Sequence, residues 1–124
     1  MYSLKWPAVW ITGAWLLVAT VVYLSLARLP DALPTPGGDK TAHVAAYALM
    51  MFFFMQIYSR RSYRVLTGIG LVLLGIVLEV LQGYTGYRAF EYADMVANTL
   101  GVIVGWAAGP PRTFNFFVRI ENTI

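Results

Sequence analysis

The sequence predicts an all-α membrane protein with four transmembrane helices arranged as two hairpins. Of its 124 residues, 59% are hydrophobic and 12% are charged, whereas soluble domains have about 45–50% apolar and about 25% charged residues. A chain of this length cannot bury so much apolar surface in one core, because small domains bury only about two-thirds of their surface. The apolar residues also fall into long runs with almost no charge, which is typical of membrane-spanning helices.

The first three runs each contain at most one Asp, Glu, His, Lys or Arg residue. Residues 7–27 contain none and are long enough to cross about 30 Å of hydrocarbon. Residues 41–58 are interrupted only by His43, and residues 65–82 only by Glu79. We expect one transmembrane helix in each run.

The fourth run, approximately residues 94–109, is shorter and carries Asn98. A helix over this run is long enough to cross the bilayer only if it includes Asp94 or neighbouring residues. Pro110 and Pro111 end it, because proline lacks the backbone donor that a helix requires. Residues 1–124 are therefore predicted to form a single transmembrane domain.

The N-terminal run allows one alternative interpretation. Lys5, the apolar run and the small residues around Ser25 are also typical of a signal peptide with a cleavage site. The run is longer than a typical signal core, and it holds Trp10 and Trp15. We therefore expect it to be the first span, with cleavage as the alternative.

The basic residues predict the orientation of the four spans. With the N-terminus inside, six basic residues are cytoplasmic and three are external, in agreement with the positive-inside rule. The cytoplasmic set is Lys5, Arg60, Arg61, Arg64, Arg112 and Arg119, and the external set is Arg28, Lys40 and Arg88. Both termini are predicted to be cytoplasmic.

Polar side chains gather near the predicted outer end of three spans. Asp39 precedes His43 by four residues, and Asp94 precedes Asn98 by four, so each pair shares one helical face. Glu79 lies roughly one turn below the outer end of its span. We expect these side chains to form one layer just beneath the outer interface.

Small residues lie on the same faces as these polar side chains. Gly68 and Gly75 share a stripe with Glu79, and Gly101 and Gly105 share one with Asn98. Small residues allow membrane helices to approach closely, so the polar groups should point into the bundle. An ionisable residue within a span costs several kcal/mol and indicates function. The alternative is that these groups only hydrogen-bond to each other and hold the bundle together.

The order of these motifs resembles that of the VanZ-like family of small bacterial integral membrane proteins. DKTAHVAAY opens the second span, Glu79 and Gln82 close the third, and Arg88 precedes DMVANTLGVIVG. The resemblance covers about residues 29–105. The family is named for a protein that gives resistance to the lipoglycopeptide teicoplanin, and most members have no assigned activity. The resemblance implies that the protein lies in a bacterial plasma membrane and acts in the cell envelope.

We predict an outward-facing polar site, towards the periplasm or cell exterior, that recognises or modifies a lipid-linked or amphiphilic molecule. Lys40 and Arg88 supply positive charge for a phosphate or carboxylate. In an enzyme, His43 would be the general base and Glu79 the acid. The candidate catalytic residues are His43, Glu79 and Asp94, and the candidate ligand-binding residues are Asp39, Lys40, Tyr47, Gln82, Arg88 and Asn98.

Two alternatives to this function remain open. One is a non-catalytic amphiphile-binding or structural membrane protein. The other is a proton-linked transporter, although polar residues near one face alone argue against a relay across the membrane. The sequence leaves open whether the protein is an enzyme.

No cofactor is predicted, and no residue is assigned as a metal ligand. The carboxylates would suit a hard divalent cation, whereas a single His excludes a His-rich zinc site, and the lack of Cys excludes thiolate metal sites and disulfides. Expected partners are membrane lipids, a lipid-linked envelope precursor or lipoglycopeptide, and a second copy of the chain. A net charge of +3 is too small to indicate nucleic acid.

Overall fold

Helices are the only regular secondary structure in the described part of the chain. A computed structural model describes residues 2–26, 38–84, 92–110 and 112–123, with side chains from residue 41 onward in the second of these ranges. No strand occurs in these ranges. The helices are α1 (Pro7–Leu26), α2 (Gly38–Ile57), α3 (Arg61–Tyr84), α4 (Tyr92–Ala108) and α5 (Phe116–Thr123).

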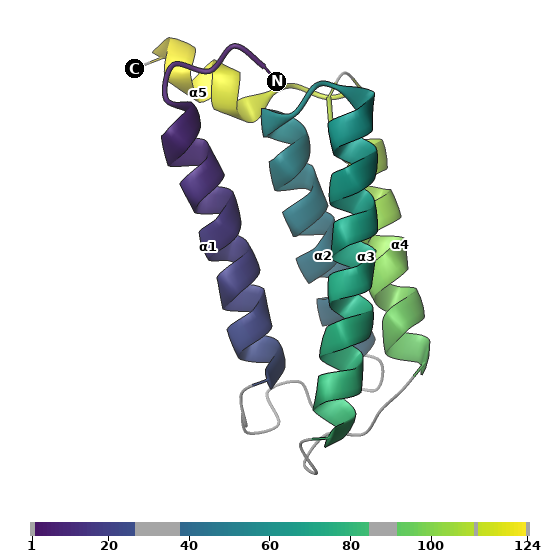
Figure 1. The fold of residues 1–124 in the computed structure, drawn as a ribbon. Coiled ribbons are helices and arrows are strands. Elements are labelled where there is room, and N and C mark those ends of the chain that lie inside the picture. The colour runs from purple at the N-terminus through teal and green to yellow at the C-terminus, as the bar shows by residue number, and fades with distance from the viewer. Residues whose placement is uncertain (1, 27–37, 85–91, 111, 124) are drawn as a thin grey trace.

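The first four helices run alternately up and down, side by side, and α5 lies across one end of them (Figure 1). Both chain termini and α5 lie at this end, which we call the terminal end. The opposite end carries the C-terminal ends of α1 and α3 and the N-terminal ends of α2 and α4, and we call it the loop end. This antiparallel order agrees with the two predicted hairpins.

The closest packing in the bundle is between α2 and α4, and glycines make it possible. A Cβ atom on Gly101 would lie 2.5 Å from the backbone oxygen of Val44, and one on Gly105 would clash with the backbone oxygen of Ala48. No side chain fits at either position without moving the helices apart. The predicted small-residue face of the fourth span therefore does face a neighbouring helix.

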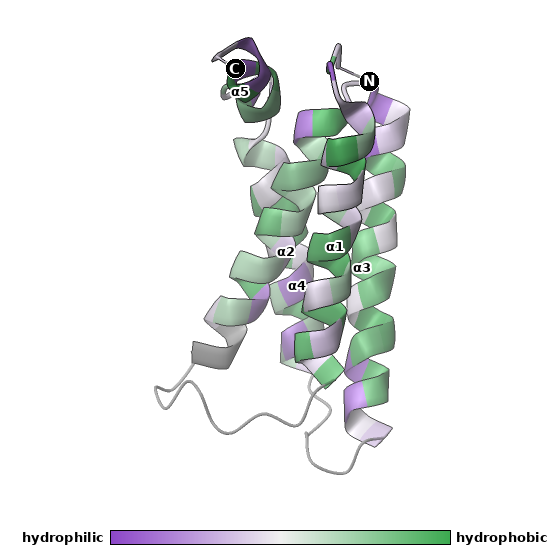
Figure 2. Cartoon of the chain, turned by 90° about the vertical axis from the view of Figure 1, so that its left-hand side faces the viewer, coloured by the Kyte–Doolittle hydropathy of each residue, from purple (hydrophilic) through white to green (hydrophobic). Residues whose placement is uncertain are grey.

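The core lies around α2, whereas α1 and one side of α3 are exposed. Tyr47, Met50, Met51 and Met55 of α2 are almost completely buried. In α1 the buried residue is Ala14, and large apolar side chains such as Leu16 are exposed. Figure 2 shows hydrophobic residues over most of the helical surface and hydrophilic ones mainly towards the helix ends. Soluble monomers rarely expose such extensive apolar surface, so lipid is the natural solvent for these helices.

Helices α1 and α3 are each long and apolar enough to cross a membrane by length and composition. The apolar part of α2, Thr41–Ile57, is shorter. All four predicted spans coincide with helices whose ends differ by a few residues from the predicted ones. Their crossing of the bilayer and the cytoplasmic location of the termini remain predictions.

The fifth helix was not predicted, and hydrogen bonds hold it against the end of α2. Asn115 accepts a bond from the Val118 backbone N–H at 3.1 Å and thereby caps α5. Its side-chain amide donates to the Gln56 backbone oxygen at 2.9 Å, and the Gln56 side-chain oxygen accepts from the Phe116 N–H at 2.7 Å. Helix α5 therefore folds back onto the end of the bundle.

A buried carboxylate joins the two ends of the chain. Glu121, which is 1% exposed, accepts hydrogen bonds from the backbone N–H groups of Lys5 at 2.6 Å and Trp6 at 3.0 Å, and from the indole of Trp10 at 2.7 Å. The Trp10 ring stacks on Phe117 with centroids 4.1 Å apart. Glu121 therefore neutralises the positive N-terminal end of α1. Trp10 therefore belongs to this junction.

Arg64 was predicted to be an ordinary cytoplasmic charge, but it is buried. Its Nε donates to the backbone oxygen of Tyr58 at 2.6 Å, and one of its terminal nitrogens donates to the Tyr2 hydroxyl at 2.9 Å and the Met55 oxygen at 3.2 Å. These carbonyls belong to the C-terminal end of α2, where backbone acceptors lack helical partners. Arg64 therefore caps α2 and fixes the turn into α3.

Candidate functional site

The polar layer at the loop end begins with a hydrogen bond between α2 and α4. His43 Nδ1 lies 2.8 Å from Asn98 Oδ1. An amide oxygen can only accept, so this bond requires a proton on Nδ1 and leaves Nε2 as the basic nitrogen of a neutral ring. Asn98 is 3% exposed, whereas His43 is half-buried. The two helices thus fix the imidazole through its Nδ1.

Two further polar side chains from α2 and α3 lie deeper in the bundle. Tyr47, one turn beyond His43, is 2% exposed, and Glu79 of α3 is 1% exposed. A buried carboxylate is costly in an apolar bundle, and its presence indicates a specific role.

Gln82 connects α3 to the end of α1. Its side-chain amide donates to the Ser25 backbone oxygen at 2.8 Å, and the residue is 3% exposed. Ser25 lies in the last turn of α1, whose carbonyl groups have no partner within the helix. This bond holds α1 against the polar layer at the loop end.

The first turn of α4 adds a second buried carboxylate. Asp94 is 5% exposed and lies one turn before Asn98. A Cβ atom on Gly75 would lie 2.9 Å from the side-chain nitrogen of Asn98, so α3 approaches α4 directly at this amide. The structure therefore brings His43, Asn98 and the Glu79 face of α3 into one region, as the helical spacing predicted.

A pocket of about 270 Å³ lies beside these groups, between α1, α2 and α3. Its polar lining consists of Ser25, His43, Tyr47 and Gln82. The apolar lining consists of Val21, Leu24, Ala42 and Ala46. The pocket is thus polar on one side and apolar on the other, and its volume is close to the lower end of the range for small-molecule sites.

The predicted site residues divide into three groups. His43, Tyr47 and Gln82 line the pocket, whereas Glu79, Asp94 and Asn98 are buried in the layer behind or beside it. Asp39 and Lys40 lie in the first turn of α2, but their side chains are outside the described part. Arg88 also lies outside the described residues.

The described residues contain no group of three or more His, Asp or Glu side chains that could hold a metal ion. Hydrogen bonds at the loop end instead pair His43 with Asn98 and Gln82 with Ser25. Sequence reasoning selected the side chains of this layer but missed the Ser25 carbonyl, because a backbone acceptor has no signature in the sequence.

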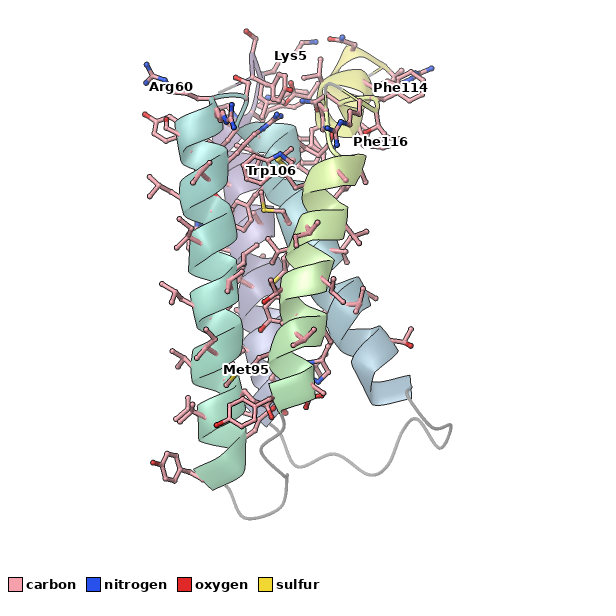
Figure 3. The ribbon with its side chains drawn as sticks, turned by 90° about the vertical axis from the view of Figure 1, so that its right-hand side faces the viewer. Lys5, Arg60, Met95, Trp106, Phe114 and Phe116 are labelled. Carbon is pink, nitrogen blue, oxygen red and sulfur yellow. The ribbon has the colours of Figure 1, made fainter. Side chains whose placement is uncertain are left out.

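The loop end lies at the far end of the bundle from the cationic residues of the terminal end. Met95, one residue after Asp94, lies at the loop end, whereas Lys5 and Arg60 lie at the opposite end (Figure 3). The described polar layer and the basic end are therefore separated by most of the length of α3. This arrangement defines a helical protein of membrane type with a polar site near one end.

Comparison with known proteins agrees with this class. The family model described as VanZ/LLP1 matches residues 4–112, so the chain belongs to the VanZ-like family. An uncharacterised protein of the fission yeast Schizosaccharomyces pombe is 33% identical over an alignment of 73 residues, which covers 56% of this chain and 45% of that protein. The match thus covers less than half of the relative's length. No solved structure matches the chain.

Proposed function

We propose that the loop-end pocket binds the polar headgroup of an amphiphile at the outer face of a bacterial plasma membrane. The observation that carries this proposal is the two-sided lining of the pocket. His43, Tyr47 and Gln82 offer hydrogen-bonding groups, and the neighbouring apolar wall includes Leu24 and Ala46. This combination suits a molecule with a polar head and an apolar stem, such as a lipid-linked envelope precursor or a lipoglycopeptide.

The chemistry of the layer also suits modification of the bound molecule. His43 Nε2 accepts a proton from water or from a hydroxyl of the ligand, while Asn98 holds the Nδ1–H in place. Glu79 and Asp94 are the candidate acid and orienting carboxylate, and Lys40 and Arg88 are the candidate cations for a phosphate or carboxylate. A hard divalent cation is a further candidate partner of the carboxylates. The family name makes teicoplanin resistance one candidate outcome of this activity.

Native mass spectrometry of protein extracted gently from its own membrane tests the binding proposal. Ala46→Phe places a ring in the pocket, whereas Ala45→Phe places the same ring on an exposed neighbouring position outside the pocket lining. We expect the unaltered protein and Ala45→Phe to retain an amphiphile and Ala46→Phe to lose it. Equal retention by all three proteins would overturn the proposal.

His43→Gln then separates modification from binding alone. A catalytic His43 predicts that this variant keeps the ligand but loses turnover of it. A variant that is less thermally stable but retains the ligand and turns it over at the same rate would instead support a structural role for His43. The His43–Asn98 and Gln82–Ser25 hydrogen bonds are also compatible with such a role.

A further inference from the structure

A second and larger hollow lies between α1 and α3, towards the terminal end. It is a groove of about 900 Å³, and its lining is almost entirely apolar and aromatic. Trp15 and Val18 of α1 form one wall, and Gly70 and Leu74 of α3 are part of the other. The helices that form these walls are the two that are long and apolar enough to cross a membrane.

The length of the groove matches the depth of one leaflet. On α3 its lining extends from Tyr63 to Leu74, which is roughly 16 Å at the rise of an α-helix. Half of the hydrocarbon core of a bilayer is about 15 Å thick. The groove therefore extends from the terminal-end interface to about the middle of the bilayer, which is the depth that one acyl chain occupies.

Tyrosines and cations lie at the interfacial end of the groove. Tyr58 and Tyr63 line this end, and tyrosine favours the headgroup region because one side of it is apolar and the other polar. Arg60 and Arg61 are exposed there, and the Arg60 guanidinium lies 5.7 Å from the centre of the Tyr63 ring. Figure 3 shows the Arg60 side chain extending outward at this end. Clustered cations beside a membrane helix attract anionic lipid headgroups.

The groove also has open space at its centre. A Cβ atom on Gly70 would have no heavy atom within 4 Å. A methyl group can therefore be added at this position without a clash. Gly101 and Gly105 of α4 lie directly against a neighbouring helix. Gly70, by contrast, borders open space in the groove.

We propose that this groove binds one acyl chain of an anionic phospholipid from the leaflet at the terminal end, with Arg60 and Arg61 holding its phosphate. The groove is separate from the loop-end pocket and has a different ligand. Three features favour a lipid over a second copy of the chain as the occupant. The length of the groove matches one leaflet, its walls are apolar, and cations lie at its interfacial end.

Photo-crosslinking tests this proposal in phosphatidylcholine nanodiscs that contain diazirine-labelled phosphatidylglycerol. Crosslinked residues are mapped by peptide mass spectrometry. Gly70→Leu fills the groove, whereas Ile69→Leu gives the same residue at an exposed neighbouring position outside its lining. We expect the unaltered protein and Ile69→Leu to crosslink mainly at groove residues, and Gly70→Leu to lose this labelling while its thermal stability is unchanged.

The charge requirement has its own matched pair of variants. Arg60→Gln combined with Arg61→Gln should lower the preference of groove labelling for phosphatidylglycerol over labelled phosphatidylcholine by about tenfold. Arg112→Gln combined with Arg119→Gln removes the same charge elsewhere and should leave this preference unchanged.

Three results would overturn the proposal. The first is labelling spread evenly over the exposed apolar residues, and the second is groove labelling that survives Gly70→Leu. The third is a groove without lipid labelling together with a dimer that Gly70→Leu disrupts, which would show that a second copy occupies the groove.

Discussion

His43 is the residue that carries the proposed chemistry of the loop-end pocket, and the sequence contains no other histidine. Its Nδ1 is hydrogen-bonded to Asn98 Oδ1 at 2.8 Å. We predict that the neutral ring carries its proton on Nδ1, because the amide oxygen accepts from that position. Asn98→Leu should release the ring into a mixture of both tautomers.

Nitrogen NMR of protein labelled only at histidine measures the tautomer of His43 directly, because this ring gives all of the signal. Gln82→Leu is a suitable control, since Gln82 donates to the Ser25 carbonyl and takes no part in the His43–Asn98 hydrogen bond. A ring protonated on Nε2 in the unaltered protein would refute the assigned tautomer.

Glu121 gives a pH-dependent contribution to stability at the opposite end. Burial raises the pKa of its carboxyl group, but hydrogen bonds from Lys5 N–H, Trp10 and Trp6, and the charge of Lys5, together lower the pKa below its ordinary value of 4.5. A carboxyl with a lowered folded-state pKa stabilises the fold above its unfolded-state pKa and loses this contribution as the pH falls through the folded-state value.

We therefore expect Glu121→Gln to lower the thermal unfolding midpoint at neutral pH. The difference from the unaltered protein should shrink as the pH falls below 4.5. Glu91→Gln removes one carboxylate at a position thirty residues away in the sequence and serves as the control. A difference that is the same at neutral and strongly acidic pH would contradict the role of the Glu121 charge.

At the level of helices, the contact between α2 and α4 should be the least tolerant of added volume. A Cβ atom on Gly101 would lie 2.5 Å from the Val44 oxygen and 2.9 Å from the Tyr47 Cβ. We expect Gly101→Ala to lower the free energy of unfolding by about 1–3 kcal/mol, as overpacking commonly does.

Gly70→Ala is the matched control on α3. Its new methyl group meets no atom within 4 Å, and replacement of a helical glycine by alanine commonly stabilises by about 0.4–1 kcal/mol. Reversible unfolding in detergent compares the two variants. Equal effects of both substitutions would show that the tight α2–α4 contact is absent.

The positions of the four long helices were predictable because each lies in a run with almost no charge. Their faces were predictable as well, since Gly75 and Glu79, or Asn98 and Gly101, recur at helical spacing and are buried as expected. Helix α5 was not predictable from such local patterns. It depends on contacts between residues far apart in sequence, such as Glu121 with Lys5 and Phe116 with Gln56.

The candidate site was predictable only in part for the same reason. Helical periodicity brought His43 and Asn98 to facing sides of their helices, and their hydrogen bond follows from that placement. The bond from Gln82 to the Ser25 carbonyl depends on how α1 leans against α3, which spacing within one helix does not determine. The burial of Arg64 likewise depends on the end of α2 and on Tyr2.

The whole molecule is polarised along the helical axis. One end carries α5, the Glu121 junction and exposed arginines such as Arg60, and the other carries the layer around His43 and Asp94. The helices between these ends are mainly hydrophobic (Figure 2), and many of their large apolar side chains are exposed. Membership of the VanZ-like family fits this arrangement, and the proposed ligands divide accordingly, with an amphiphile headgroup at the loop end and an anionic lipid at the terminal end.

We propose that the polar layer faces the outside of the cell, and single-cysteine labelling measures this orientation. The chain has no native cysteine. Ala93→Cys places a thiol at the loop end and Ser62→Cys places one at the terminal end, both at exposed positions. A membrane-impermeant maleimide applied to intact cells should label Ala93→Cys alone, and both variants after permeabilisation. Labelling of Ser62→Cys alone in intact cells would place the polar layer inside and contradict the account.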